Sequence, residues 1–176
     1  MSTKRITAIA IATLVVLAVA VGPAAAAPGD TSTTFTIAAG SLSVSVPASA
    51  NLGSVATGSS SVSGQLGAVT VTDTRGALVA TWTSSVSSTT FTTGGASANE
   101  TVAKASIAYS SGAASATTGT GAFTPGVLAN LSSSGTAGSW AGVGNDSATW
   151  SPTLVMTLLS SQVAGTYSGT VNHSVA

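Results

Sequence analysis

AVTVTDTRGALVATWTSSV, residues 68–86, is the stretch that decides the fold, because its apolar residues alternate with threonine and serine on both sides of a short charged turn. Alternation with a period of two is typical of a half-buried β-strand. The stretch therefore predicts strands at Val69–Asp73 and Leu78–Val86. The turn between them is expected to use Asp73 as an acceptor of backbone hydrogen bonds and Gly76 at a positive φ. An ion pair with Asp73 is expected for Arg75, and a turn that fixes Arg75 toward a ligand is the functional alternative.

Similar alternating runs recur along the chain, and they lie at 42–46, 101–109, 153–159 and 167–175. Short alternating runs that are separated by turn residues predict an all-β fold, a single-domain antiparallel β-sandwich or flattened barrel of about eight to ten strands. Residues 50–67, 110–126 and 130–148 are rich in Gly, Ser, Thr and Asn and are predicted to be loops. Structureless loops of this length are uncommon, so each is expected to hide a short strand or to carry a binding surface.

The first 27 residues have the pattern of a secretory signal peptide. Lys4 and Arg5 precede an uncharged apolar run at Ile6–Val21, and the small-residue run Ala24–Ala27 follows. This order of positive, apolar and small residues predicts cleavage near Ala27. The expected domains are thus residues 1–27, the signal peptide, and residues 28–176, one β-domain without a membrane span.

Charged side chains are rare in the predicted mature chain. They number six: Asp30, Asp73, Arg75, Glu100, Lys104 and Asp146. Two positive and four negative charges give a formal balance of −2, which cannot gather phosphates by counterion release, so no nucleic-acid partner is expected. The chain has no Cys, so its stability must come from sheet hydrogen bonds and apolar burial, which fits a bacterial envelope or exterior.

The residues that could carry catalysis are few. A single His, one Lys and no thiol follow the signal peptide, and no nucleophile motif is present. We therefore expect no enzyme, no cofactor and no zinc site. Calcium bound by Asp146 beside Asn145 stays an alternative to a simple turn stabilised by these side chains.

The aromatic residues divide into two groups by their surroundings. Trp82 shares a strand face with Leu78 and Val86, and Trp150 precedes another alternating run, so both are expected in the core. Trp140 lies in the predicted Gly/Ser loop, where it either contacts a ligand or folds back to cap the barrel. His173 shares an inward face with Tyr167 and is expected to be a neutral, hydrogen-bonded packing residue.

Two segments resemble the WxL-domain proteins of Gram-positive bacteria, in particular their secreted actinobacterial relatives. LGAVTVTDTRGALVATWTSSV at 66–86 has the turn and the Trp of the first motif, and AGTYSGTVNHSVA at 164–176 has the layout of the closing strand. Trp82-Thr83-Ser84 stands where the family has Trp-x-Leu, and His173-Ser174-Val175 stands at the second motif. The resemblance implies an exported β-domain that is noncovalently attached to the cell surface and binds peptidoglycan.

Together these features predict a secreted, non-enzymatic binding module of the cell wall. Its partners would be peptidoglycan or other surface proteins. The rival interpretation is a structural or self-assembling surface protein, because an uncharged Ser/Thr-rich sheet has few charges that prevent edge pairing. The candidate ligand-binding residues are Asp73, Arg75, Trp82, Trp140, Tyr167 and His173.

Overall fold

The computed structural model describes residues 32–176, so the predicted signal peptide lies outside the described residues. The chain divides into two compact units, Met1–Thr36 and Ile37–Ala176. The described end of the first unit, residues 32–36, has no assigned secondary structure and is exposed. The fold below is that of the second unit.

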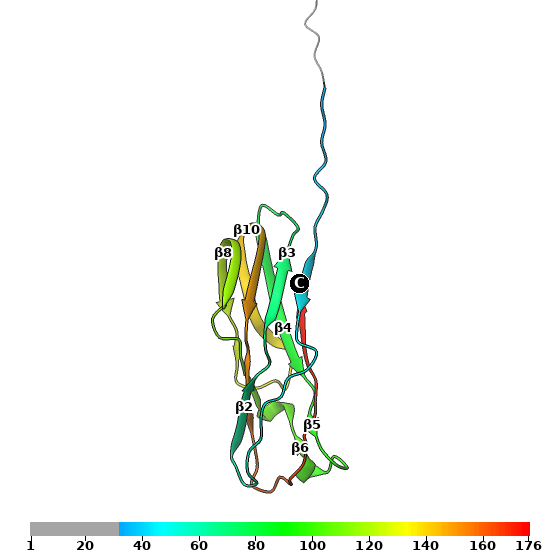
Figure 1. Ribbon diagram of the computed structural model, residues 1–176, viewed down its shortest axis with the longest axis vertical. Coiled ribbons are helices and arrows are strands. Elements are labelled where there is room, and N and C mark those ends of the chain that lie inside the picture. The colour runs from blue at the N-terminus through cyan, green and yellow to red at the C-terminus, as the bar shows by residue number, and fades with distance from the viewer. Residues whose placement is uncertain (1–31) are drawn as a thin grey trace, which may run out of the picture. The chain divides into compact units, whose positions relative to one another are not determined.

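The main sheet has six antiparallel strands in the order β1-β3-β10-β4-β12, with β8 on the other side of β10. Their bounds are β1 Leu42–Ser45, β3 Val69–Asp73, β4 Ala80–Ser88, β8 Ala116–Pro125, β10 Gly135–Trp150 and β12 Val171–Val175. The long β10 pairs with β4 through its first half and with β3 through its second half, and β8 follows both halves with a register shift. The sheet therefore curls on itself into a nearly closed barrel, and Figure 1 shows β8, β10 and β3 together at one end.

A second sheet lies against the other end of β10 and has the order β2-β11-β7-β9. Its strands are β2 Ser61–Gln65, β11 Thr153–Thr157, β7 Ile107–Ser110 and β9 Val127–Leu128. A small pair, β5 Phe91–Thr92 and β6 Thr101–Val102, and two 3₁₀ turns, Ala98–Glu100 and Lys104–Ser106, complete the unit. Figure 1 shows β2, β5 and β6 at the end away from β8.

Two apolar clusters fill the interior. The first lies under the second sheet and includes Ile107, Tyr109, Leu154 and Met156. The second lies inside the curled sheet and consists of Val69, Val71, Trp82, Trp140, Ala148 and Trp150. Leu66 packs against the first cluster and Phe123 against the second.

The predicted all-β antiparallel fold is confirmed, and β3 has the predicted bounds. The strand expected at 78–86 begins later, at Ala80, and Leu78 is 89% exposed, so its predicted place beside Trp82 was wrong. The run at 101–109 is broken by the Lys104–Ser106 turn. All three predicted loops contain strands, and the largest correction concerns 130–148, most of which belongs to β10.

Glycine explains why β8 and β10 have the composition of loops. A Cβ atom on Gly142 would lie 2.6 Å from Trp140 Nε1, and one on Gly138 would lie 2.5 Å from the ring of Phe123. A Cβ on Gly121 would likewise meet the Trp140 ring at 2.8 Å. Large rings thus cover the glycine backbone of these strands, which supplies the burial that glycine itself lacks.

Candidate functional site

The charged turn at one end of the curled sheet has the predicted geometry. The Asp73 carboxylate accepts from the Arg75 backbone N–H at 2.9 Å and from Arg75 Nε and Nη2 at 2.9 and 2.7 Å. Arg75 Nη2 also donates to the Thr81 carbonyl at 3.0 Å, and Gly76 has a φ of +63°. The hydrogen bonds from Arg75 lower the pKa of Asp73 below its ordinary value. The turn therefore holds a buried carboxylate and a partly exposed guanidinium in one fixed pair.

Asp146 is a second buried carboxylate at the same end, directly opposite Asp73 in the β3–β10 register. Trp82 Nε1 donates to Asp146 Oδ1 at 2.8 Å, while Oδ2 has no hydrogen-bond partner among residues 32–176. Burial raises the pKa of Asp146, and the charge of Asp73 acts in the same direction. The predicted turn stabilised by the Asp146 side chain is thus wrong, because this carboxylate faces inward to Trp82.

The bend between the two halves of β10 is made by backbone contacts instead. Gly144 has a φ of +73°, and its N–H donates to the Ala77 carbonyl at 2.8 Å. Across residues 32–176, no three His, Cys, Asp or Glu side chains gather in a way that could hold a metal ion.

The tryptophans form one buried stack. Trp82 lies 6.4 Å from both Trp140 and Trp150, with interplanar angles of 8° and 18°. Phe123 stacks on Trp150 at 5.0 Å. Trp82 and Trp140 are only 2% and 3% exposed. Trp140 therefore lies within strand β10 and is buried, although its sequence neighbours suggested a loop.

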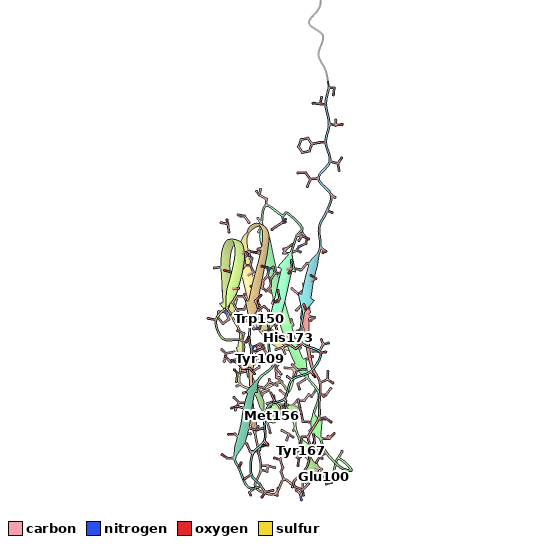
Figure 2. The ribbon with its side chains drawn as sticks, viewed as in Figure 1. Glu100, Tyr109, Trp150, Met156, Tyr167 and His173 are labelled. Atoms are coloured by element: carbon pink, nitrogen blue, oxygen red, sulfur yellow. The ribbon has the colours of Figure 1, made fainter. Side chains whose placement is uncertain are left out.

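His173 belongs to a chain of polar contacts that shares Trp150 with the stack, and Figure 2 shows it beside Tyr109 and Trp150. Trp150 Nε1 donates to the Tyr109 hydroxyl at 3.1 Å, and that hydroxyl lies 3.2 Å from His173 Nε2. Because an indole N–H only donates, the tyrosine hydrogen is free to point at Nε2 of a neutral imidazole. Burial lowers the pKa of His173 to about 4 and raises that of Tyr109 to about 12.

Tyr167 lies in a third place, near Glu100 in Figure 2 and away from Trp150. Its hydroxyl, as donor, lies 3.0 Å from the carbonyl oxygens of Asn99 and Val163. These contacts tie the chain before β12 to the 3₁₀ turn at Ala98–Glu100. The structure therefore gives Tyr167 a role in joining loops.

The six candidate residues do not form one site. Asp73, Arg75 and Trp82 meet at one end of the curled sheet with Asp146, Trp140 stacks beneath them, and His173 and Tyr167 lie elsewhere. Sequence reasoning missed the partner of Trp82, because the pairing of positions 82 and 146 depends on how β10 bends. It also missed Tyr109, whose inward alternation with Ile107 was the available signal. Ligand binding by the six residues stays a prediction.

The exposed groups beside the Asp73–Arg75 pair are mainly apolar. Leu78 and Val79 are 89% and 72% exposed on the loop that follows Gly76, and the Arg75 side chain is 38% exposed. This loop offers a guanidinium and two apolar side chains to a partner.

A hollow of about 180 Å³ lies elsewhere, between the first half of β12 and the loop that follows β1. Val46, Leu52, Phe91, Val171 and His173 are among its lining residues. It is smaller than the about 300–1,000 Å³ of a typical small-molecule pocket. Most of its lining residues have apolar side chains, and Ser49, Thr170 and His173 add polar groups.

In comparisons with known proteins, no family model, no curated protein and no solved structure matches this chain. The helices found in residues 32–176 include none with the length and apolar character needed to cross a membrane.

Proposed function

We propose that this chain is an exported, non-enzymatic structural protein of the cell surface that associates with copies of itself through its β-sheet edges. The observation that carries the proposal is the absence of charge along β1 and β12, two of the three strands that lie at an edge of the main sheet, the third being β8. β1 reads LSVS and β12 reads VNHSV. Monomeric β-proteins commonly protect such edges with Lys, Pro or inward-facing charges, and neither strand contains these residues.

The distribution of the remaining charge supports the same conclusion. Asp73 and Arg75 neutralise each other, and Asp146 is buried. Glu100 and Lys104 are then the other charged side chains between residues 32 and 176, and both lie away from β1 and β12 in sequence. A surface with so little charge offers weak electrostatic resistance to contact between copies.

Export and surface location enter the proposal through the sequence. The apolar run at Ile6–Val21 supports export, and the resemblance of residues 66–86 and 164–176 to WxL-domain proteins supports retention at a Gram-positive surface. Both expectations concern the location of the protein and are compatible with self-association.

Light scattering of the secreted form, recovered from the medium of an exporting Gram-positive host, tests self-association. We expect the weight-average mass to rise with protein concentration and to change little between low and high salt, because apolar and backbone contacts are not screened. A mass that stays at one chain over the whole concentration range would contradict the proposal.

Noncovalent binding to peptidoglycan is the second candidate, and the loop with Arg75, Leu78 and Val79 is the observation that favours it. In co-sedimentation with purified sacculi, Arg75→Gln and Leu78→Ser should each release the protein into the supernatant. Leu159→Ser is the matched control, because Leu159 is also exposed, at 63%, but lies after β11. Equal binding by all the variants would exclude this loop as the wall-binding surface.

A further inference from the structure

The segment at residues 32–41, STTFTIAAGS, is the most unusual part of the described chain. All ten residues are exposed and have no assigned secondary structure. Phe35 and Ile37 are 88% and 84% exposed, and they alternate with threonine as in a β-strand. When a partner covers an exposed aromatic residue and an exposed β-branched residue on one face of a strand, their burial stabilises the contact.

A free sheet edge is available for such a strand. β1 and β12, like β8, each pair with a single strand of the main sheet. β1 and β12 contact each other, but within residues 32–176 no backbone hydrogen bond joins them. Ala176 exchanges backbone hydrogen bonds with Thr83 in β4, and Thr89 donates to the Thr170 carbonyl. By the alternation of an antiparallel pair, the backbone groups of Val171, His173 and Val175 then face away from β4, toward the edge.

The apolar hollow lies against the first half of this edge. β1 has ended at this point, and the chain at 46–52 turns aside, which leaves Val171 and His173 as one wall of the hollow. A strand that paired along Gly169–His173 would therefore lie over a mainly apolar, side-chain-sized depression. Phe35 is the largest side chain that such a strand could bring to it.

A second copy of the pentapeptide in this segment already packs at the hollow. STTFT occurs at 32–36 and again at 88–92. In the second copy, Thr92 exchanges backbone hydrogen bonds with Ser168, and Phe91 is half-buried in the lining of the hollow. The first copy has the same side chains in the same order, but no strand partner among the described residues.

We propose that residues 32–39 of one copy add as a β-strand to the free edge at Gly169–His173 of a second copy, with Phe35 in the hollow beside Phe91. This inference rests on the proposed self-association and names the segment and the edge that produce it. Ser41 is hydrogen-bonded to Thr74 of its own chain, so eight residues, 32–39, are left to pair. Extended, they span about 26 Å, against about 17 Å for five residues of edge. The segment can therefore cover the edge and still connect to its own β1. Because donor and acceptor are different surfaces, the contact is heterologous and builds open chains.

The first experiment compares two double variants of the secreted protein by sedimentation equilibrium. Phe35→Ser with Ile37→Ser should raise the concentration for half-association by roughly tenfold or more, because two large apolar side chains are lost from the contact. Val127→Ser with Leu159→Ser is the matched control, since it removes two exposed apolar residues, 75% and 63% exposed, from other surfaces, and it should associate as the wild type does. If the Phe35→Ser, Ile37→Ser variant associates as the wild type does, strand addition is overturned while self-association stands.

The second experiment uses a labelled peptide, STTFTIAAGS, and the Phe35→Ser, Ile37→Ser chain as acceptor. We expect saturable binding in fluorescence anisotropy, and we expect Ala48→Trp to weaken it, because Ala48 lines the hollow and a larger side chain would fill it. Circular dichroism of the Ala48→Trp variant establishes that it is folded.

The two proposals fail in different ways. Absence of peptide binding, or binding that a folded Ala48→Trp variant leaves unchanged, overturns the proposed contact even if the protein self-associates. If the wild-type protein remains monomeric while the peptide binds, the proposed self-association is overturned, but the proposal that the edge binds a strand stands.

Discussion

His173 is the residue whose chemistry the structure changes most. The imidazole lies 3.2 Å from the Tyr109 hydroxyl, and burial lowers its pKa to about 4 from an ordinary 6.5. The folded protein thus keeps a neutral His where the unfolded chain would bind a proton. His173 Nε2 can accept the hydrogen of the Tyr109 hydroxyl, and this explains why a polar residue occupies the inward face of β12.

This shift predicts a pH dependence of stability. Between about pH 6.5 and pH 4 the unfolded state binds more protons at His173, so the free energy of unfolding should fall as pH is lowered and stay level above pH 6.5. After a discount for partial exposure, the total is on the order of 2 kcal/mol. Urea unfolding from pH 4 to 8 measures it. His173→Gln should flatten the profile, and a sloping profile in that variant would assign the effect to another group.

Asp146 gives a pH dependence of the opposite sign. Burial raises its pKa, so near and above pH 3.8 the folded protein holds a proton that the unfolded chain releases, and stability from this group is lost as pH rises through the folded pKa. Asp146→Asn has no such loss and keeps an acceptor for Trp82 Nε1. Its stability relative to the wild type should therefore increase from pH 4 to pH 7. A difference that is constant with pH would show that Asp146 titrates normally.

At the scale of elements, β10 is the strand on which the main sheet depends. It pairs with β4, β3 and β8, and its glycines lie under the rings of Trp140 and Phe123. Any Cβ at these glycines must displace a ring or the neighbouring backbone. The curled sheet therefore requires glycine at these positions, where the rings pack directly on the backbone.

Gly142→Ala tests this condition. Its Cβ would lie 2.4 Å from the Thr120 carbonyl oxygen and 2.6 Å from Trp140 Nε1, so we expect a loss of about 1–3 kcal/mol in the free energy of unfolding. Gly95→Ala is the control, because its Cβ would meet nothing closer than Glu100 Oε2 at 3.7 Å, and it should unfold like the wild type. Equal stability of the two variants would mean that Trp140 moves freely.

The same element shows where sequence reasoning succeeds and where it stops. Val69–Asp73 and the start of β11 at Thr153 follow simple alternation and were predicted correctly. β10 was predicted mostly as a loop because its sequence is rich in glycine and serine. Its burial comes from aromatic rings that cover those glycines. One of these rings, Phe123, belongs to β8, and the other, Trp140, belongs to β10 itself. The contact of Trp82 with Asp146 was unpredictable for a related reason, since it needs the bend of β10 at Gly144.

At the scale of the whole molecule, composition and alternation were sufficient to predict a single class of fold. They could not show that β1 and β12 would end as neighbouring edges, because that depends on the order of all six strands. The repeated STTFT was visible in the sequence, but only the structure separates its packed copy from its exposed copy. The proposed self-association therefore rests on the chain's low charge and on the edges that its topology leaves at β1 and β12.

Sedimentation velocity of the secreted protein over a wide concentration range tests this central claim most directly. Because heterologous strand addition builds open chains, we predict a ladder of species, with monomer, dimer and trimer resolved and larger species growing with concentration. A single boundary with the coefficient of one chain at every concentration would contradict the account.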